Sequence, residues 1–370
     1  NSVDSVFASC RSRTLRRTEV GELMVPRRLP LTVASGDRHG SIAGTSACRR
    51  ALVIACLHSQ QSPLDLWPRQ SGLVHSFSRA MVWFAALSLF GCGGPPASRF
   101  PDGEAALSRM RATYACSRGL VGEAKIDFID GSTRVRGNVS ILASLPDRTR
   151  LDAFSPFGVS LSTLTTDGGN FAFFDLKRRS FLEGPATPCN ISRFTQVPMP
   201  AFALVQLLRG EAPVLKHEAN GSSLTWNSGW ISGGSYRVQV LGQHESRQVV
   251  ELTPHPDDFG RPWQEQRVRV LKVDLEQQGI PLYSVEFDEH RVAQTAKTRE
   301  DPDGIDPAIH PSGPACSAEI PRRMRIVMPK DDRDLVIHFD RVEHNPPLVP
   351  GAFRQVRPDG ATYSRAECGS

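Results

Sequence analysis

The sequence lacks several common signatures, and each absence excludes a class of protein. No apolar run reaches the roughly 20 residues that a membrane-spanning helix needs. There is no phosphate-binding loop and no dinucleotide fingerprint, and the segment 158–162 lacks the closing glycine of a nucleophile elbow. No CxxC pair and no histidine cluster at zinc spacing occurs, so we expect neither a metal site nor a cofactor. An enzyme is therefore not expected.

The charge of the chain is unevenly distributed. The whole sequence carries a formal net charge of +5, but the 91 residues before Cys92 contain 11 Arg and 5 acidic residues. The remainder holds 33 basic and 34 acidic residues and is close to neutral. No basic stripe with interleaved aromatic residues follows Cys92, so nucleic acid is not an expected partner.

The first part of the chain does not have the pattern of a folded domain. Residues 1–73 show no sustained hydrophobic period of 2 or 3.6, and we expect a non-native or disordered leader there. Residues 74–91 have the form of a signal peptide, because His75 and Arg79 precede the apolar run Met81–Phe90. That run is too short to span a bilayer.

The signal-peptide segment ends in Leu89-Phe90-Gly91-Cys92, which resembles the lipobox of bacterial lipoproteins. Phe90 departs from the small residue that is usual there. The resemblance implies cleavage before Cys92, lipidation of Cys92 and a periplasmic location. Residue 93 is Gly rather than Asp, which favours the outer membrane. Residues 92–102 are then expected to form a tether.

Four cysteines remain after such processing: Cys116, Cys189, Cys316 and Cys368. The periplasm is oxidising, so disulfides are allowed there. Two bridges can form and three pairings are open. We expect Cys316–Cys368, because these two residues flank the last hairpin and its tail.

The pattern of the remaining chain indicates a mainly β fold. Asp102 can cap a helix that runs to about Ser117, and a second helix follows Pro200 and is closed by Gly210. Residues 291–316 are polar and are expected to form a long loop. We expect one curved, mostly antiparallel sheet of about eleven strands closed by helices. Strand patterns occur at 122–128, 135–141, 149–154, 159–165, 170–176, 179–183, 222–231, 235–241, 247–253, 265–275, 282–288, 323–328 and 335–339.

In order along residues 103–360, these features resemble the LolA/LolB lipoprotein-localisation family, and LolB in particular. The resemblance rests on the first helix and strand, on Ser155-Pro156-Phe157-Gly158, on Val197-Pro198-Met199-Pro200 with the apolar helix after it, and on the final strands from Ile320. Ile141 stands where LolB usually has Trp, the segment 291–316 is an insertion, and 361–370 is a tail.

The resemblance implies a half-open β-barrel with a helical lid that encloses an acyl-chain cavity. It implies a monomer that takes lipoproteins from a periplasmic carrier and inserts them in the outer membrane, held there by its own lipid anchor. Pro156, Phe157 and Gly158 would form an apolar transfer loop. Strand residues expected to line the cavity are Ile126, Phe128, Val139, Ile141, Leu151, Leu161, Phe171 and Phe173.

Two other functional hypotheses remain open. The same fold with a filled core would suit a structural or sensory envelope lipoprotein that acts through protein contacts. A hydrolase is the weakest hypothesis, since the densest polar cluster, His338-Phe-Asp340-Arg-Val-Glu343-His344, has the pattern of a solvated sheet face.

Overall fold

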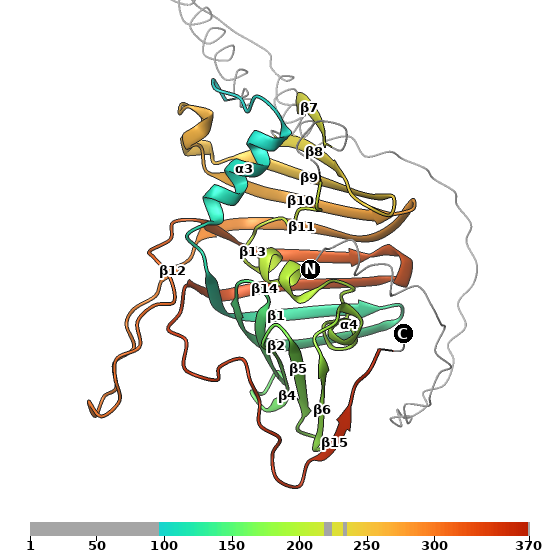
Figure 1. Ribbon diagram of the computed structural model, residues 1–370, viewed down its shortest axis with the longest axis vertical. Helices are drawn as coiled ribbons and strands as arrows, with labels where there is room; N and C mark the ends of the chain where they lie inside the picture. Colours follow the sequence, from blue (N-terminus) through green and yellow to red (C-terminus); the bar gives the residue numbers. More distant parts are fainter. Residues whose placement is uncertain (1–95, 218–223, 232–234, 369–370) are drawn as a thin grey trace, which may run out of the picture. The chain divides into compact units, whose positions relative to one another are not determined.

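The computed structural model describes residues 96–217, 224–231 and 235–368, which belong to one compact unit (Figure 1). Its helices are α3 (Gly103–Tyr114), α4 (Pro188–Thr195) and α5 (Ala201–Leu208), with the short 3-10 turns η4 (Pro256–Asp258), η5 (Trp263–Glu265) and η6 (Pro329–Asp331). Its strands are β1 (Gly119–Asp130), β2 (Thr133–Ser144), β3 (Arg148–Phe154), β4 (Ser160–Thr166), β5 (Asn170–Asp175), β6 (Ser180–Pro185), β7 (Leu224–Ile231), β8 (Ser235–Leu241), β9 (Ser246–Pro254), β10 (Val268–Gln277), β11 (Ile280–Val292), β12 (Gln294–Thr295), β13 (Glu319–Met328), β14 (Arg333–His344) and β15 (Thr362–Arg365).

All of these strands belong to one sheet. Its main path runs β15-β6-β5-β4-β3-β2-β1-β14-β13-β11-β10-β9-β8-β7, and β12 pairs with β14 beside that path. The pairings are antiparallel except for β15 with β6 and β12 with β14. Within the described residues, the edge strands β7 and β15 do not pair with each other, so the sheet is not closed. The expected mainly β, half-open architecture is confirmed.

The expected number of about eleven strands is lower than the fifteen strands of the sheet in the described residues, and two of these fifteen have no counterpart among the thirteen strand patterns of the sequence. Two short strands, β12 and β15, lie in the polar loop and in the polar tail. All four residues of β15 are exposed, and both residues of β12 are exposed. Neither strand has the apolar alternation that identifies a half-buried strand, so pattern analysis cannot find them.

The helices pack against different parts of the sheet, as Figure 1 shows. Helix α3 contacts β7 and β10, whereas α5 contacts β2 and β3. The Asp102 side chain caps α3 by accepting a hydrogen bond of 2.7 Å from the Ala105 amide, as expected. The helix ends at Tyr114 rather than near Ser117. Among the described residues, no helix is long and apolar enough to cross a membrane.

The segment expected to be a tether is attached to the sheet from Ala97 onward. The Ala97 amide donates to the Phe259 carbonyl at 3.3 Å, and Ser98 Oγ accepts from the Trp263 amide at 3.0 Å. The buried Phe100 ring makes edge contacts with Tyr236 and Trp263. These contacts fix the residues before α3 against the η4–η5 segment.

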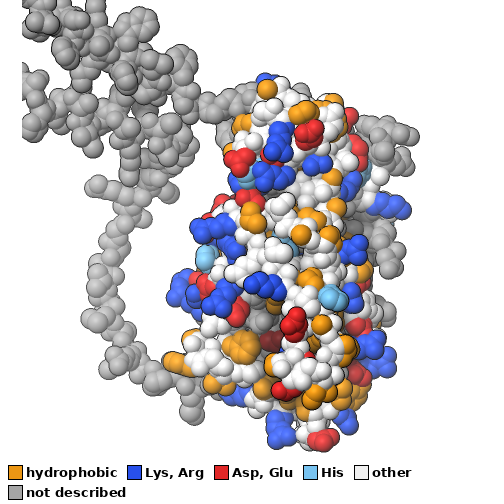
Figure 2. Space-filling view, turned by 90° about the vertical axis from the view of Figure 1, so that its left-hand side faces the viewer, with side chains coloured by type: hydrophobic (Ala, Val, Ile, Leu, Met, Phe, Trp, Pro, Cys, Tyr) orange, Lys and Arg blue, Asp and Glu red, His pale blue; other side chains and the backbone are white. Residues whose placement is uncertain are grey.

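The surface carries charges of both signs. Figure 2 shows blue and red side chains interspersed over one face, with hydrophobic side chains between them. Many of these charges form cross-strand pairs, such as Arg247 with Glu276 and Arg325 with Asp334, each at 2.6 Å. Such a mixed surface fits the near-neutral charge of the chain after Cys92.

Candidate functional site

The strongest candidate site is an apolar cavity between the sheet and the helices α4 and α5. Its volume is about 440 Å³, within the range of roughly 300–1,000 Å³ that is common for small-molecule sites. Four of the lining residues are polar or charged: Asp130, Ser162, Thr195 and Gln196. The apolar lining residues are Ile126, Phe128, Val135, Val139, Ile141, Leu151, Ala153, Leu164, Phe173, Phe194, Val197, Leu204, Leu208, Leu335 and Ile337.

Strand register explains why these side chains meet. Ile141 lies directly opposite Leu151, Leu151 opposite Leu164, and Leu164 opposite Phe173. Residues that are paired directly across a sheet project to the same face. A continuous apolar row therefore crosses β2, β3, β4 and β5 and forms the floor of the cavity.

The roof comes from α4, α5 and the turn between them. The Phe194 ring at the end of α4 stacks on Phe173, with ring centroids 4.3 Å apart. Helix α4 ends at Thr195, and the next residue, Gln196, has a left-handed conformation with φ of 60° that turns the chain toward Val197. Leu204 and Leu208 from α5 complete the lining.

The structure brings together six of the eight strand residues that were expected to line the cavity: Ile126, Phe128, Val139, Ile141, Leu151 and Phe173. Leu161 does not join them and is 43% exposed. Ser162 and Leu164 face the cavity, so Leu161 lies on the opposite face of β4. Phe171 is buried in a smaller cluster with Ile191 and Ala366 instead.

Sequence reasoning expected a helical lid, but it named none of the lining residues of the roof and missed the contribution of β14. Leu335 and Ile337 alternate on β14 and could have been found by the same period of two that identified Ile126 and Phe128. Phe194 lies in α4, which the sequence analysis did not predict; the helix has eight residues and mostly polar side chains, with the i, i+3 pair Ile191 and Phe194 as its main apolar signal.

The loop Ser155–Val159 between β3 and β4 projects a single aromatic ring. Phe157 is 92% exposed. Ser155 Oγ accepts hydrogen bonds from the amides of Phe157 (3.3 Å) and Val159 (3.1 Å), and Gly158 has a positive φ of 80°. The loop is therefore closed on its own backbone, and its expected exposure agrees with the structure. Its role in transfer stays a proposal.

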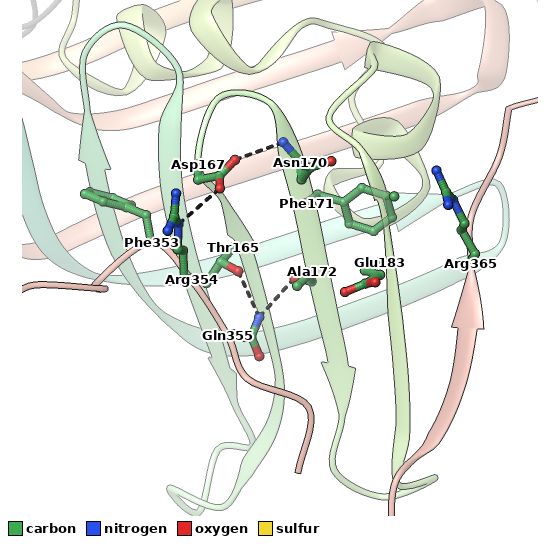
Figure 3. A pocket seen from close by; sticks show the side chains of 11 residues that line it. Thr165, Asp167, Asn170, Phe171, Ala172, Glu183, Phe353, Arg354, Gln355 and Arg365 are labelled. Carbon is green, nitrogen blue, oxygen red and sulfur yellow. Dashed lines mark hydrogen bonds and ion pairs between the residues drawn. The ribbon is translucent and has the colours of Figure 1, made fainter.

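A second cavity, of about 360 Å³, is polar and is less suited to a lipid (Figure 3). Two of its charged residues already bind each other, because Asp167 pairs with Arg354 at 3.3 Å. Hydrogen bonds from the Asn170 and Gly169 amides hold the pKa of Asp167 below its usual value. The Gln355 amide nitrogen donates to Thr165 Oγ1 and to the Ala172 carbonyl. We interpret this pocket as the place where the C-terminal segment crosses β4 and β5.

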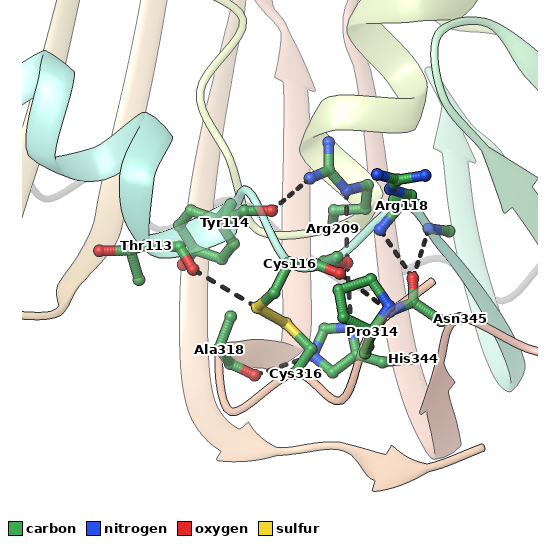
Figure 4. The surroundings of a disulfide bond; sticks show 12 residues. Thr113, Tyr114, Cys116, Arg118, Arg209, Pro314, Cys316, Ala318, His344 and Asn345 are labelled. Atoms are coloured by element: carbon green, nitrogen blue, oxygen red, sulfur yellow. Dashed lines mark hydrogen bonds between the residues drawn. A yellow bond between two sulfur atoms is a disulfide. The ribbon is translucent and has the colours of Figure 1, made fainter. Parts of the chain in front are cut away.

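A buried polar junction lies where α3 leads into β1 (Figure 4). His344 corrects the expectation of a solvated face, because it is only 2% exposed. Its Nδ1 lies 2.9 Å from Ser117 Oγ and its Nε2 lies 2.8 Å from the Ala318 carbonyl. Burial lowers the pKa of His344. The pairing of β1 with β14 is irregular between Glu123 and Ala124, and this irregularity shifts which residues of β14 face the core. A strict alternation of faces along the sequence therefore did not predict the burial of His344.

The Ser117–His344 contact does not form a catalytic arrangement. Ser117 is fully buried, so no substrate can reach its hydroxyl group. The second nitrogen of His344 bonds a backbone carbonyl rather than a carboxylate. The neighbouring Asn345 is similarly structural: its side chain accepts from the Arg118 amide at 2.7 Å and donates to the Pro314 carbonyl, also at 2.7 Å. Within the described residues, no group of His, Cys, Asp and Glu side chains could hold a metal ion.

The disulfide pairing differs from the expected Cys316–Cys368. The structure pairs Cys116 with Cys316 (Figure 4) and Cys189 with Cys368. Cys116 directly follows α3 and meets the end of the long loop at the polar junction. Cys189 lies in α4, a helix that the sequence pattern did not indicate, and this helix lies beside the end of the tail.

Leu89, Phe90, Gly91 and the lipidation candidate Cys92 lie outside the described residues, as do the signal peptide and residues 1–73.

Comparison with known proteins adds distant structural likenesses. No family model and no curated protein matches the sequence. A DUF1329 family protein from Desulfovibrio piger is similar with a TM-score of 0.43 and 10% identity, over 68% of this chain and 96% of that one. A LolA superfamily protein from Nitrosomonas europaea has a TM-score of 0.41 and 11% identity, over 69% and 98%. A putative outer membrane lipoprotein-sorting protein domain from Vibrio parahaemolyticus has a TM-score of 0.39 and 10% identity, over 67% and 95%. Likenesses this distant do not assign a function.

Proposed function

We propose that this protein is a lipid-anchored envelope protein that binds acyl chains in the apolar cavity and delivers lipoproteins to the outer membrane. The observation that carries the proposal is the cavity itself. Its floor is a row of apolar side chains across β2–β5, and its roof is mainly apolar, with Thr195 and Gln196 as polar members. Each methylene group that moves from water into such a site contributes about 0.8 kcal/mol, so even part of an acyl chain would bind.

The remaining elements of the proposal have separate support. The segment ending in Cys92 has the pattern of a lipoprotein signal. Several acyl chains on one cysteine would anchor the chain stably, whereas a single chain binds only marginally. Phe157 gives the protein an exposed aromatic residue beside the sheet, which suits contact with a membrane or with cargo.

Native mass spectrometry of the full chain carrying Cys92→Ser tests acyl binding without interference from the protein's own lipid. We expect masses that correspond to bound fatty-acyl species. Ala153→Trp should remove them, because Ala153 lines the cavity and an indole would fill the space. Arg150→Trp is the matched control, since Arg150 lies on the same strand and faces the other side of the sheet.

Two results would contradict the proposal. One is a chain that carries no acyl species after mild extraction and takes up none from added fatty acid. The other is equal acyl occupancy in Ala153→Trp and Arg150→Trp. Either result would favour a structural or sensory lipoprotein that acts through protein contacts.

A further inference from the structure

The chain between the proposed lipid anchor and the folded body is very short. Three residues, Gly93, Gly94 and Pro95, separate Cys92 from Pro96, the first described residue. Four residue steps span at most about 14 Å when fully extended. Wherever Cys92 sits in the bilayer interface, Pro96 must lie within that distance of it.

The residues after Pro96 cannot lengthen this connection, because they are bound to the η4–η5 segment. We call Ala97–Phe100 together with Phe259–Gln266 the clamp. Gln266 is its centre: the fully buried side chain donates to the Ser98 carbonyl at 3.0 Å and to the Arg261 carbonyl at 2.9 Å. The Gln266 carbonyl in turn accepts from Arg109 Nε of α3 at 2.6 Å.

Aromatic packing strengthens the clamp. Phe100 is 4% exposed and lies edge-on to Tyr236 at 5.2 Å and to Trp263 at 6.2 Å between ring centroids. A side chain buried to this degree contributes strongly to stability and is not expected to detach spontaneously. Because the clamp is packed on the body of the protein, the distance limit between Cys92 and Pro96 also limits the distance between the anchor and this part of the body.

We propose that the clamp is the membrane-facing surface of the anchored protein and that the short connection holds it against the phospholipid headgroups. This inference rests on the lipidation of Cys92 that the proposed function includes, but it does not depend on acyl binding in the cavity. The outer side of the clamp is exposed at Arg99, Arg261, Gln264 and Glu265. The two arginines can meet headgroup phosphates, and the amide and the carboxylate can meet interfacial water or the cationic part of a zwitterionic headgroup.

The topology supplies a matched reference position far from the clamp. Strand β6 is nine positions from β10 in the sheet order, and neighbouring strands are about 4.8 Å apart. Arg178 precedes β6 and has a 72% exposed side chain that pairs with Asp175. Arg261 in the clamp has a 58% exposed side chain and pairs with Asp258. Both are exposed arginines that pair with an aspartate three residues earlier.

The experiment uses the lipidated protein in phosphatidylcholine–phosphatidylglycerol vesicles that contain a headgroup-level quencher lipid. A fluorophore is attached to Arg261→Cys or to Arg178→Cys, and the melting temperature of each labelled protein is compared with that of the parent. We expect a large loss of emission at position 261 and little loss at position 178. Inserting ten Gly and Ser residues after Gly94 should reduce the loss at position 261, because the connection then no longer limits the distance.

Equal quenching at the two positions would overturn the inference, as would quenching at position 261 that the insertion leaves unchanged. A chain that is not lipidated would not associate with the vesicles at all, so a failure of the proposed lipidation can be told apart from a failure of the proposed clamp orientation. If the labelled proteins associate and position 261 is quenched while no acyl species occupies the cavity, the clamp orientation stands and only the acyl-binding proposal fails.

Discussion

Replacing Phe157 with Glu should leave the fold almost unchanged while it impairs delivery of lipoproteins. Phe157 is 92% exposed. An aromatic side chain buries about 150–250 Å² when fully enclosed, so this ring buries at most about 20 Å² in the folded protein. At about 25 cal/mol per Å², the loss of that contact is at most about 0.5 kcal/mol.

The expected effect on delivery is much larger. If the ring enters the bilayer interface or contacts cargo, removing it costs the transfer free energy of a buried Phe, about 1.5–3 kcal/mol. That corresponds to a loss of roughly tenfold to a hundredfold in the equilibrium constant of the contact. The assay is the transfer of a labelled lipoprotein to outer-membrane vesicles, run beside urea unfolding of the same preparation.

Two controls make the result specific. Ile305→Glu introduces the same charge at another exposed apolar loop residue, 84% exposed, and should leave delivery unchanged. Phe287→Ala removes a core ring that is 2% exposed and should cost about 3–5 kcal/mol of stability, which shows that the unfolding assay responds. A large stability loss in Phe157→Glu would place the ring in the core. Unchanged delivery at unchanged stability would remove the loop from the mechanism.

Three further predictions concern the anchor, a disulfide and a histidine. Cys92→Ser should abolish membrane association on cell fractionation, and a variant that is still extracted only by detergent would refute the lipobox. Cys116→Ser with Cys316→Ser should lower the free energy of unfolding by about 2–4 kcal/mol, the usual contribution of one disulfide; an unchanged urea midpoint would argue against that contribution. Burial lowers the pKa of His290 to about 4, so its imidazole stays neutral in the folded state while the unfolded chain takes up a proton below about pH 6.5. The contribution of the neutral His290 to the free energy of unfolding is therefore fully present above pH 6.5 and should fall by at most about 3 kcal/mol as the pH drops to 4. His290→Phe should flatten this part of the plot of unfolding free energy against pH. An unchanged slope would assign the acid sensitivity to other groups.

The period-of-two pattern predicted those parts of the site that depend on local geometry alone. Ile126 and Phe128 on β1, or Val139 and Ile141 on β2, share a face because alternate residues of any strand do so. Leu161 shows the limit of this reasoning. Strand β4 contains leucines at 161 and 164 among Ser and Thr residues, and these two leucines lie on opposite faces. Only pairing with β3, where Leu151 lies opposite Leu164, decides which one faces the cavity.

Features that depend on long-range contact were not predictable from one sequence. The pairing of Cys189 with Cys368 requires α4 and the tail to meet across a separation of 179 residues. Helix α4 itself has eight residues, and isolated helices of that length are marginal without tertiary packing. The burial of His344 likewise depends on Ser117 and Ala318, which come from distant parts of the chain.

The bridge between α4 and the tail restrains the roof of the apolar cavity. The helix supplies Phe194 to the roof of the cavity, and its Cys189 is bonded to Cys368. The tail before Cys368 is itself fixed to the sheet edge by β15, whose Thr362 pairs with Ser180. While the Cys189–Cys368 bond is formed, α4 cannot move away from the sheet unless β15 also separates from β6. If the cavity binds acyl chains as proposed, reduction of the Cys189–Cys368 bond would release α4 from the tail and remove this restraint on the roof of the cavity.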